Sequence, residues 1–121
     1  MKKLLLTALI ILSLCAPVFG EAPDWSKPSD TKTADAAITT GPGYFYGILV
    51  MTDATNACTV VAYDNASAAS GTTLFPSWVV TTSTTDRAQY LSFRHPVKYL
   101  NGIYVDITCS GTCSYKVYYN N

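Results

Sequence analysis

The chain has 121 residues with eight basic side chains, eight acidic side chains and one histidine. Residues 1–20 hold two of the basic ones, so the rest of the chain has six basic against eight acidic side chains, a net charge of −2. The six are scattered, which argues against a nucleic-acid partner because little counterion release would drive binding. The roughly 100 residues after residue 20 suit a single domain.

The first twenty residues have the three regions of a secretory signal peptide: two lysines, an apolar run over 4–15, and small residues near Gly20. We expect cleavage after Gly20 and export to the periplasm or the extracellular space. No stable membrane span is expected, because the run is shorter than the about 20 residues that a spanning helix needs. Lipidation of Cys15 is an alternative, although Leu14 before it is not a small residue.

Residues 21–33 hold two prolines, three acidic residues and one aromatic side chain, Trp25. This composition buries little apolar surface, so it predicts a flexible leader. From residue 34 the pattern changes to short runs rich in Thr, Tyr and Val, separated by turn residues. We therefore divide the chain into a signal peptide (1–20), a leader (21–33) and one β-domain (34–121).

The expected strands follow one another along this domain without a helical period. They cover residues 36–40, 44–52, 58–63, 72–75, 78–82, 88–93 and 97–100, followed by two more within 99–119. Apolar residues occupy both faces of 44–52, which predicts a central strand covered on both sides. Such short strands at even spacing predict an all-β antiparallel sandwich, jelly-roll-like, with about eight strands.

The last of these segments, 99–119, is predicted to be two strands folded back on each other. Cys109 and Cys113 flank its turn at 110–112. The Asn-Gly pair at 101–102 is the strongest hairpin signal in the chain, because both residues of a type I′ turn need a positive φ.

Three cysteines, Cys58, Cys109 and Cys113, follow the expected cleavage site, so one bridge and one spare thiol are expected in an oxidising compartment. The spacing allows a short bridge between Cys109 and Cys113. It also allows a bridge from Cys58 to either of them, which would close a longer loop and stabilise more, or no bridge. A zinc site is not expected, because structural zinc needs four ligands.

No catalytic, metal or cofactor residues are predicted. The single histidine, His95, has no nucleophile motif to serve. The carboxylates of Asp53, Asp64, Asp86 and Asp106 are all explained by turns, as are Asn56 and Asn65, because Asp and Asn side chains accept hydrogen bonds from nearby backbone amides. A small secreted hydrolase is the least favoured function, and we predict that the protein is not an enzyme.

Three sequence blocks carry a resemblance: GYFYGI at 43–48, YDNASAASGT at 63–72 and NGIYVD at 101–106. Together they resemble a group of short β-sandwich proteins from tailed-phage and prophage gene clusters, over roughly residues 34–119. The resemblance implies a β-sandwich and a virion-associated role. Those proteins usually lack a signal peptide, so the one expected here favours a host-encoded or host-adapted exported version.

Two kinds of partner are expected, another protein chain or a carbohydrate. We expect an exported structural or interaction protein that self-associates or binds a protein partner, through an edge strand or through a leader added to a neighbour's sheet. A carbohydrate-binding module is the alternative, since exposed aromatic rings stack on sugars. Its candidate stacking residues are Trp78, Tyr115, Tyr118 and Tyr119.

Overall fold

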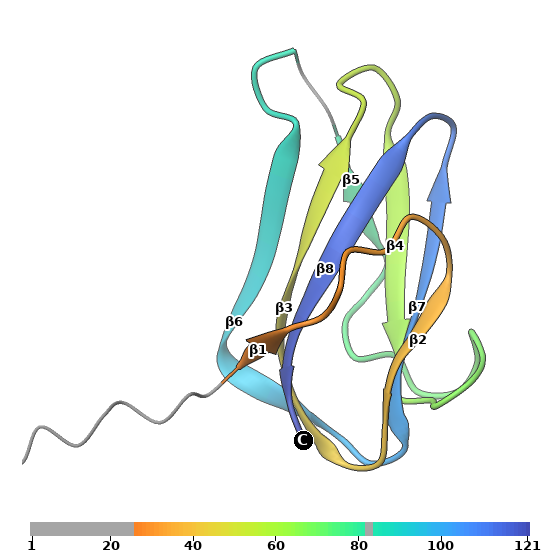
Figure 1. The fold of residues 1–121 in the computed structure, drawn as a ribbon, viewed down its shortest axis with the longest axis vertical. Helices are drawn as coiled ribbons and strands as arrows, with labels where there is room; N and C mark the ends of the chain where they lie inside the picture. The colour runs from red at the N-terminus through yellow and green to blue at the C-terminus, as the bar shows by residue number, and fades with distance from the viewer. Residues whose placement is uncertain (1–25, 82–83) are drawn as a thin grey trace, which may run out of the picture.

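The computed structural model describes residues 26–81 and 84–121, which form an all-β fold (Figure 1). The strands are β1 (Lys27–Pro28), β2 (Ala36–Thr40), β3 (Gly43–Thr52), β4 (Cys58–Tyr63), β5 (Trp78–Val80), β6 (Ala88–Tyr99), β7 (Gly102–Cys109) and β8 (Cys113–Asn120). Within these described ranges, no helix is long and apolar enough to cross a membrane. The expected all-β class is confirmed.

The strands form two antiparallel sheets of four. The first sheet has the order β1-β8-β3-β6 and the second the order β2-β7-β4-β5. Four of the strand pairs are those of a single long antiparallel hairpin that wraps around the core: β1·β8, β2·β7, β3·β6 and β4·β5. Two further pairs, β3·β8 and β4·β7, connect parts of this hairpin within each sheet. This order is that of a jelly roll, so the predicted topology is confirmed.

The core lies between the two sheets and takes inward-facing side chains from both. Its largest fully buried members include Tyr99, Tyr115, Phe45, Ile48 and Ile103. The long connection from β4 to β5 adds Phe75, whose ring centroid lies 5.7 Å from that of Phe45. This connection therefore forms part of the core, although it is not a strand.

β3 is the central strand of the first sheet, hydrogen-bonded to β8 on one side and β6 on the other. A bulge between Phe45 and Gly47 interrupts the alternation, so Phe45, Ile48 and Val50 all face the core. The expectation that this strand is covered on both faces is wrong, because Met51 on its outer face is 48% exposed.

Two other expected strands differ from those observed. Residues 72–75 belong to the β4–β5 connection, where Thr73 forms one bridge with Tyr63 and the Leu74 amide donates a hydrogen bond to the Ala62 carbonyl at 2.8 Å. Residues 88–93 and 97–100, expected as separate strands, are joined in β6. Residues 93–96 of β6 form a wide bulge opposite a single residue of β3.

The hairpin expected for residues 99–119 is wrong. β7 pairs with β2 and β4 in the second sheet, whereas β8 pairs with β1 and β3 in the first. The inward faces of β7 and β8 oppose each other across the core, and residues 110–112 carry the chain from one sheet to the other. A bridge between Cys109 and Cys113 would therefore join the two sheets at one end.

The corner at residues 101–102 also joins the two sheets, and it is not a type I′ turn. Gly102 has a φ of 147°, but Asn101 does not have a positive φ. The Asp64 carboxylate accepts hydrogen bonds from the amides of Leu100 and Asn101, at 3.0 and 2.7 Å. Partial burial alone would raise the pKa of Asp64, but the amide donors outweigh burial and the pKa is lowered. The carboxylate thus holds this corner in place.

The segment expected to be a flexible leader, 21–33, is described from Ser26 onward, and this part lies along β8. Two of its residues form β1, and the Ser29 amide donates a hydrogen bond to the Val117 carbonyl at 2.7 Å. β1, Ser29 and Lys32 therefore attach this part of the segment to the first sheet through backbone hydrogen bonds. The expected signal peptide, including Cys15 and Gly20, lies outside the described residues.

Candidate functional site

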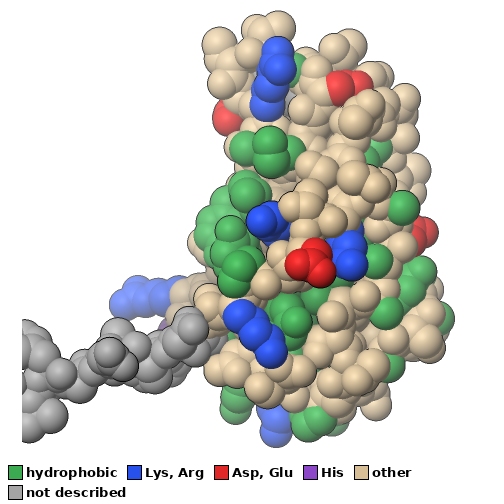
Figure 2. Space-filling model, in the orientation of Figure 1, with side chains coloured by type: hydrophobic (Ala, Val, Ile, Leu, Met, Phe, Trp, Pro, Cys, Tyr) green, Lys and Arg blue, Asp and Glu red, His purple; other side chains and the backbone are tan. Residues whose placement is uncertain are grey.

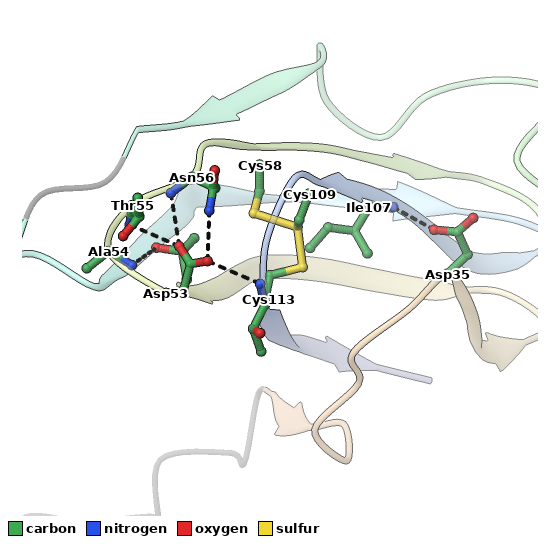
Figure 3. The surroundings of a disulfide bond; sticks show 11 residues. Asp35, Asp53, Ala54, Thr55, Asn56, Cys58, Ile107, Cys109 and Cys113 are labelled. Carbon is green, nitrogen blue, oxygen red and sulfur yellow. Dashed lines mark hydrogen bonds between the residues drawn. A yellow bond between two sulfur atoms is a disulfide. The ribbon is translucent and has the colours of Figure 1, made fainter.

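Three cysteines from three strands meet at one end of the core (Figure 3). Cys58 begins β4, Cys109 ends β7 and Cys113 begins β8. Cys58 is 1% exposed, Cys113 is 8% exposed, and Cys109 packs against the core. Their Sγ atoms all lie within 4.8 Å of one another. The fold therefore brings together the three cysteines that the sequence singled out.

Cys109 is placed to form a bridge with either neighbour. It lies directly opposite Cys58 in the β4–β7 ladder, with 4.3 Å between their Cα atoms, and its Cα is 6.5 Å from that of Cys113. Disulfides usually span Cα separations of roughly 4.4–6.8 Å, so both separations are close to or inside this range. Because one sulfur takes part in one disulfide at a time, Cys109 is the shared partner of two alternative bridges.

A hydrogen-bonded carboxylate fixes the two turns that carry these cysteines. Asp53 accepts hydrogen bonds from the amides of Thr55 and Asn56 and from the Asn56 side chain, each at 2.9 Å, and from the Thr112 amide at 3.3 Å. These donors, the Asn56 side chain first, lower the pKa of Asp53 to about 2. Gly111 makes this approach possible, because a Cβ there would overlap the Asp53 carboxylate. The turn role expected for Asp53 is confirmed.

A second carboxylate lies on the other side of the cluster (Figure 3). Asp35 accepts a hydrogen bond from the Ile107 amide at 2.8 Å, just beyond the end of the β2–β7 ladder at Ala36 and Val105. It also lines an open hollow of about 410 Å³ that reaches Cys109 and Cys113. Sequence reasoning missed Asp35, whose only signal was its place just before the strand at 36–40.

The histidine and the other carboxylates lie apart from this cluster. His95 is exposed in the bulge of β6. Asp53 precedes β4 and Asp64 follows it, so these two carboxylates lie at opposite ends of a strand and do not face each other across a cleft as glycosidases require. Asp86 lies between β5 and β6. Asp106 was expected at a turn but lies within β7, which pairs with β4 there.

The four candidate stacking aromatics have different surroundings. Tyr115 is only 1% exposed, and its hydroxyl donates a hydrogen bond to the Ala34 carbonyl at 2.9 Å, so it is a core residue and the stacking prediction is wrong for it. Trp78 and Tyr119 are partly buried against the core. Tyr118, on the opposite side of β8 from Tyr115, faces outward.

No protein-family model, curated protein or solved structure matches the chain at a significant level.

The outer face of the first sheet carries an apolar patch that sequence reasoning did not identify. Tyr90 on β6 is 52% exposed and meets Tyr118 edge to face, with ring centroids 5.4 Å apart. Leu49 on β3 is the ladder partner of Tyr90, Gly47 is that of Tyr118, and Met51 lies farther along β3. Figure 2 shows hydrophobic side chains gathered where β3 and β6 form this face. The available signal was the position of Tyr90 on the opposite face of its strand from Leu91 and Phe93, which pack against the core.

Proposed function

We propose that the mature chain is an exported, non-enzymatic structural module that assembles with further copies of itself. Each copy would place its N-terminal segment, residues 26–33, along β8 of a neighbour. The observation that supports this proposal is the way in which this segment covers the edge of β8.

Beyond β1, the segment bonds to β8 at two further points, Ser29 and Lys32. Ser29 exchanges two hydrogen bonds with Val117: the Ser29 amide donates at 2.7 Å, and the Ser29 hydroxyl accepts from the Val117 amide at 3.0 Å. Lys32 and Tyr115 exchange two backbone hydrogen bonds, at 2.9 and 2.8 Å. Without the segment, β8 would be a bare sheet edge, and such edges recruit other strands because their backbone groups are unpaired. A second copy's segment offers the same donors and acceptors.

The connection from the segment to β2 favours exchange between copies. Only residues 33–35 run from the bridge at Lys32, in the first sheet, to Ala36, in the second. Short connections of this kind favour swapping, because a neighbour's segment makes the same bonds without the constrained link. Most side chains of the segment are exposed, so its attachment depends mainly on the backbone hydrogen bonds.

Sedimentation velocity on the mature protein tests this assembly. We expect wild type to be oligomeric and Ser29→Pro to shift toward monomer, because proline removes both hydrogen bonds to Val117. Asp30→Asn changes the exposed neighbouring residue and should assemble like wild type. Inserting Gly-Ser-Gly after Ala34 should also favour monomer, because the segment then reaches its own β8 without constraint. A strictly monomeric wild type, or an assembly indifferent to Ser29→Pro and to the insertion, would overturn the proposal.

The resemblance to phage and prophage sandwich proteins supports a virion-associated or surface location for such an assembly. The predicted signal peptide favours the exported, host-adapted form. We expect the intact mass of the exported protein to correspond to a chain that begins at Glu21. A lipid-modified mass beginning at Cys15 would instead place the module on a membrane anchor.

A second candidate function is carbohydrate binding, which the outward-facing pair of Tyr90 and Tyr118 supports. Aromatic rings exposed on a sheet face can stack on sugars, and these two tyrosines place neighbouring rings on the outer face of the first sheet. Alanine at either position should abolish retention on a polysaccharide panel. Alanine at Tyr44, a tyrosine of the same sheet that is 46% exposed, is the matched control. No retention of wild type would exclude this candidate.

A further inference from the structure

We propose that the three cysteines form a thiol–disulfide exchange site, in which Cys109 moves a single bridge between Cys58 and Cys113. The proposal is independent of the assembly argued above. It rests on the position of Cys109 between two partners, each with a Cα separation compatible with a bridge and all three sulfur atoms within 4.8 Å.

The two bridges would connect different parts of the fold. A bond from Cys58 to Cys109 joins neighbouring strands of the second sheet, β4 and β7. A bond from Cys109 to Cys113 joins the second sheet to the first, across the turn at residues 110–112. Both can form without a change of strand pairing, because all three side chains already meet at the same end of the core (Figure 3).

The exchange step is balanced within the chain. When Cys58 and Cys109 are bridged, the Cys113 thiolate attacks the Cys109 sulfur, a new sulfur–sulfur bond forms, and the old bond breaks. Cys58 leaves as a thiolate and takes up a proton from water. The reverse step starts from the Cys58 thiolate. The exchange itself consumes no oxidant. The first bridge is made by an external disulfide, which oxidises two of the cysteines and is itself reduced to two thiols.

The two states differ in the thiol that they leave free. A free Cys58 is enclosed in the core, with 1% of its surface exposed, whereas a free Cys113 is 8% exposed and lines the open hollow beside Asp35. Exchange therefore decides whether the free thiol is enclosed in the core or lies at the wall of this hollow, where we expect small thiols and disulfides from solution to reach it more readily. The carboxylates of Asp35 and Asp53 lie on either side of the cluster and disfavour a further negative charge, so we expect exchange to be slow at neutral pH.

The experiment starts from one isomer of the full exported protein. Oxidation in denaturant favours the bridge between Cys109 and Cys113, because it closes the shorter loop. This isomer is purified and refolded at about pH 3, where thiolates are scarce, and then brought to about pH 8. Samples are quenched with acid, alkylated and mapped by non-reducing peptide analysis. We expect the bridge between Cys58 and Cys109 to appear with a first-order rate that does not depend on protein concentration.

Cys58→Ser in the same starting state is the matched control, because it keeps the short bridge and lacks the attacking thiol. Its bridge should stay unchanged, and circular dichroism should show the same β spectrum as wild type. Persistence of the starting isomer in folded wild type would overturn the proposal. A rate that rises with protein concentration would overturn it too, since exchange would then take place between chains.

Discussion

Asp53 and Asp64 show how single carboxylates organise a fold in which neighbouring strands belong to different sheets. Asp53 ties the β3–β4 turn to the Thr112 amide in the β7–β8 turn. Asp64, at the opposite end of β4, accepts hydrogen bonds from the amides of Leu100 and Asn101. Each carboxylate therefore joins a turn to a residue more than 30 positions away in the chain. Backbone pairing between the two strands of a turn cannot hold these turns, because those strands lie in different sheets.

The hydrogen bonds of Asp53 predict a dependence of stability on pH. Its pKa in the folded state, about 2, lies below its ordinary value of 3.8, so the folded state favours the ionised form. The resulting stability is present above about pH 4 and is lost as the pH falls through about 2. We expect urea midpoints to fall over this window in wild type and less steeply in Asp53→Asn. Asp64, whose pKa is also lowered, contributes to the pH dependence that remains in Asp53→Asn, and Asp30→Asn is the control. Parallel curves for wild type and Asp53→Asn would contradict this account.

Gly47 is required by close packing and not by a special backbone angle. A Cβ at this position would collide with the Leu91 carbonyl oxygen on β6. We expect Gly47→Ala to lower the free energy of unfolding by about 1–3 kcal/mol, because such overpacking against backbone forces the strands apart. Ser92→Ala, at the exposed position opposite Gly47, should change it by less than about 0.5 kcal/mol. Equal effects in urea titrations would count against the packing argument.

At the scale of strands and turns, most connections here are crossovers between sheets. Among the described strands, β4 and β5 are the one consecutive pair that is also hydrogen-bonded. The turn residues at 101–102 and 110–112 promote a reversal of the chain, but they do not decide whether the strands that follow lie edge to edge or face to face. The cysteines of β7 and β8 accordingly oppose each other across the core.

The two possible bridges should differ in the stability that they contribute. Cys113→Ser leaves the bridge between residues 51 positions apart, and Cys58→Ser leaves the bridge between residues four positions apart. We expect reduction to lower the free energy of unfolding by about 4 kcal/mol in the first variant and about 2 kcal/mol in the second, because the longer loop restricts the unfolded chain more. Each variant, oxidised and reduced, serves as its own packing control. The opposite order would contradict the loop-entropy reason.

At the scale of the whole molecule, the fold is a ribbon whose middle is the β4–β5 connection and whose ends are β1 and β8. The first and last strands pair, so both chain ends of the domain lie in the same sheet. Pairing strands so far apart in the chain costs loop-closure entropy before the contacts between them contribute to stability.

This topology predicts slow folding. We expect refolding on a timescale of roughly milliseconds to seconds, as for other sandwiches dominated by non-local pairing. Stopped-flow fluorescence of the partly buried Trp78, in a Trp25→Phe background, would measure it. Complete refolding within microseconds would contradict this expectation.

Strand positions followed from the sequence, whereas strand partners did not. The limits of 36–40 and 58–63 agree with β2 and β4, since β-branched and aromatic runs between turn residues mark strands locally. The bulge at Phe45 and Gly47 could not be read in this way, because it depends on the neighbouring strands. Of the candidate residues, the three cysteines were named from sequence, but their convergence came from pairing between β4 and β7.

The sequence by itself determined the all-β class, most strand positions and the three cysteines as disulfide candidates, because composition and alternation are local properties. The tertiary structure alone decided that β7 and β8 face each other, that Tyr115 is a core residue while Tyr90 is exposed, and that Cys109 has two partners. Those outcomes depend on which strand edges pair across long separations in the chain. The free energy that favours this pairing comes from burial of side chains between the two sheets, and no local sequence pattern specifies it.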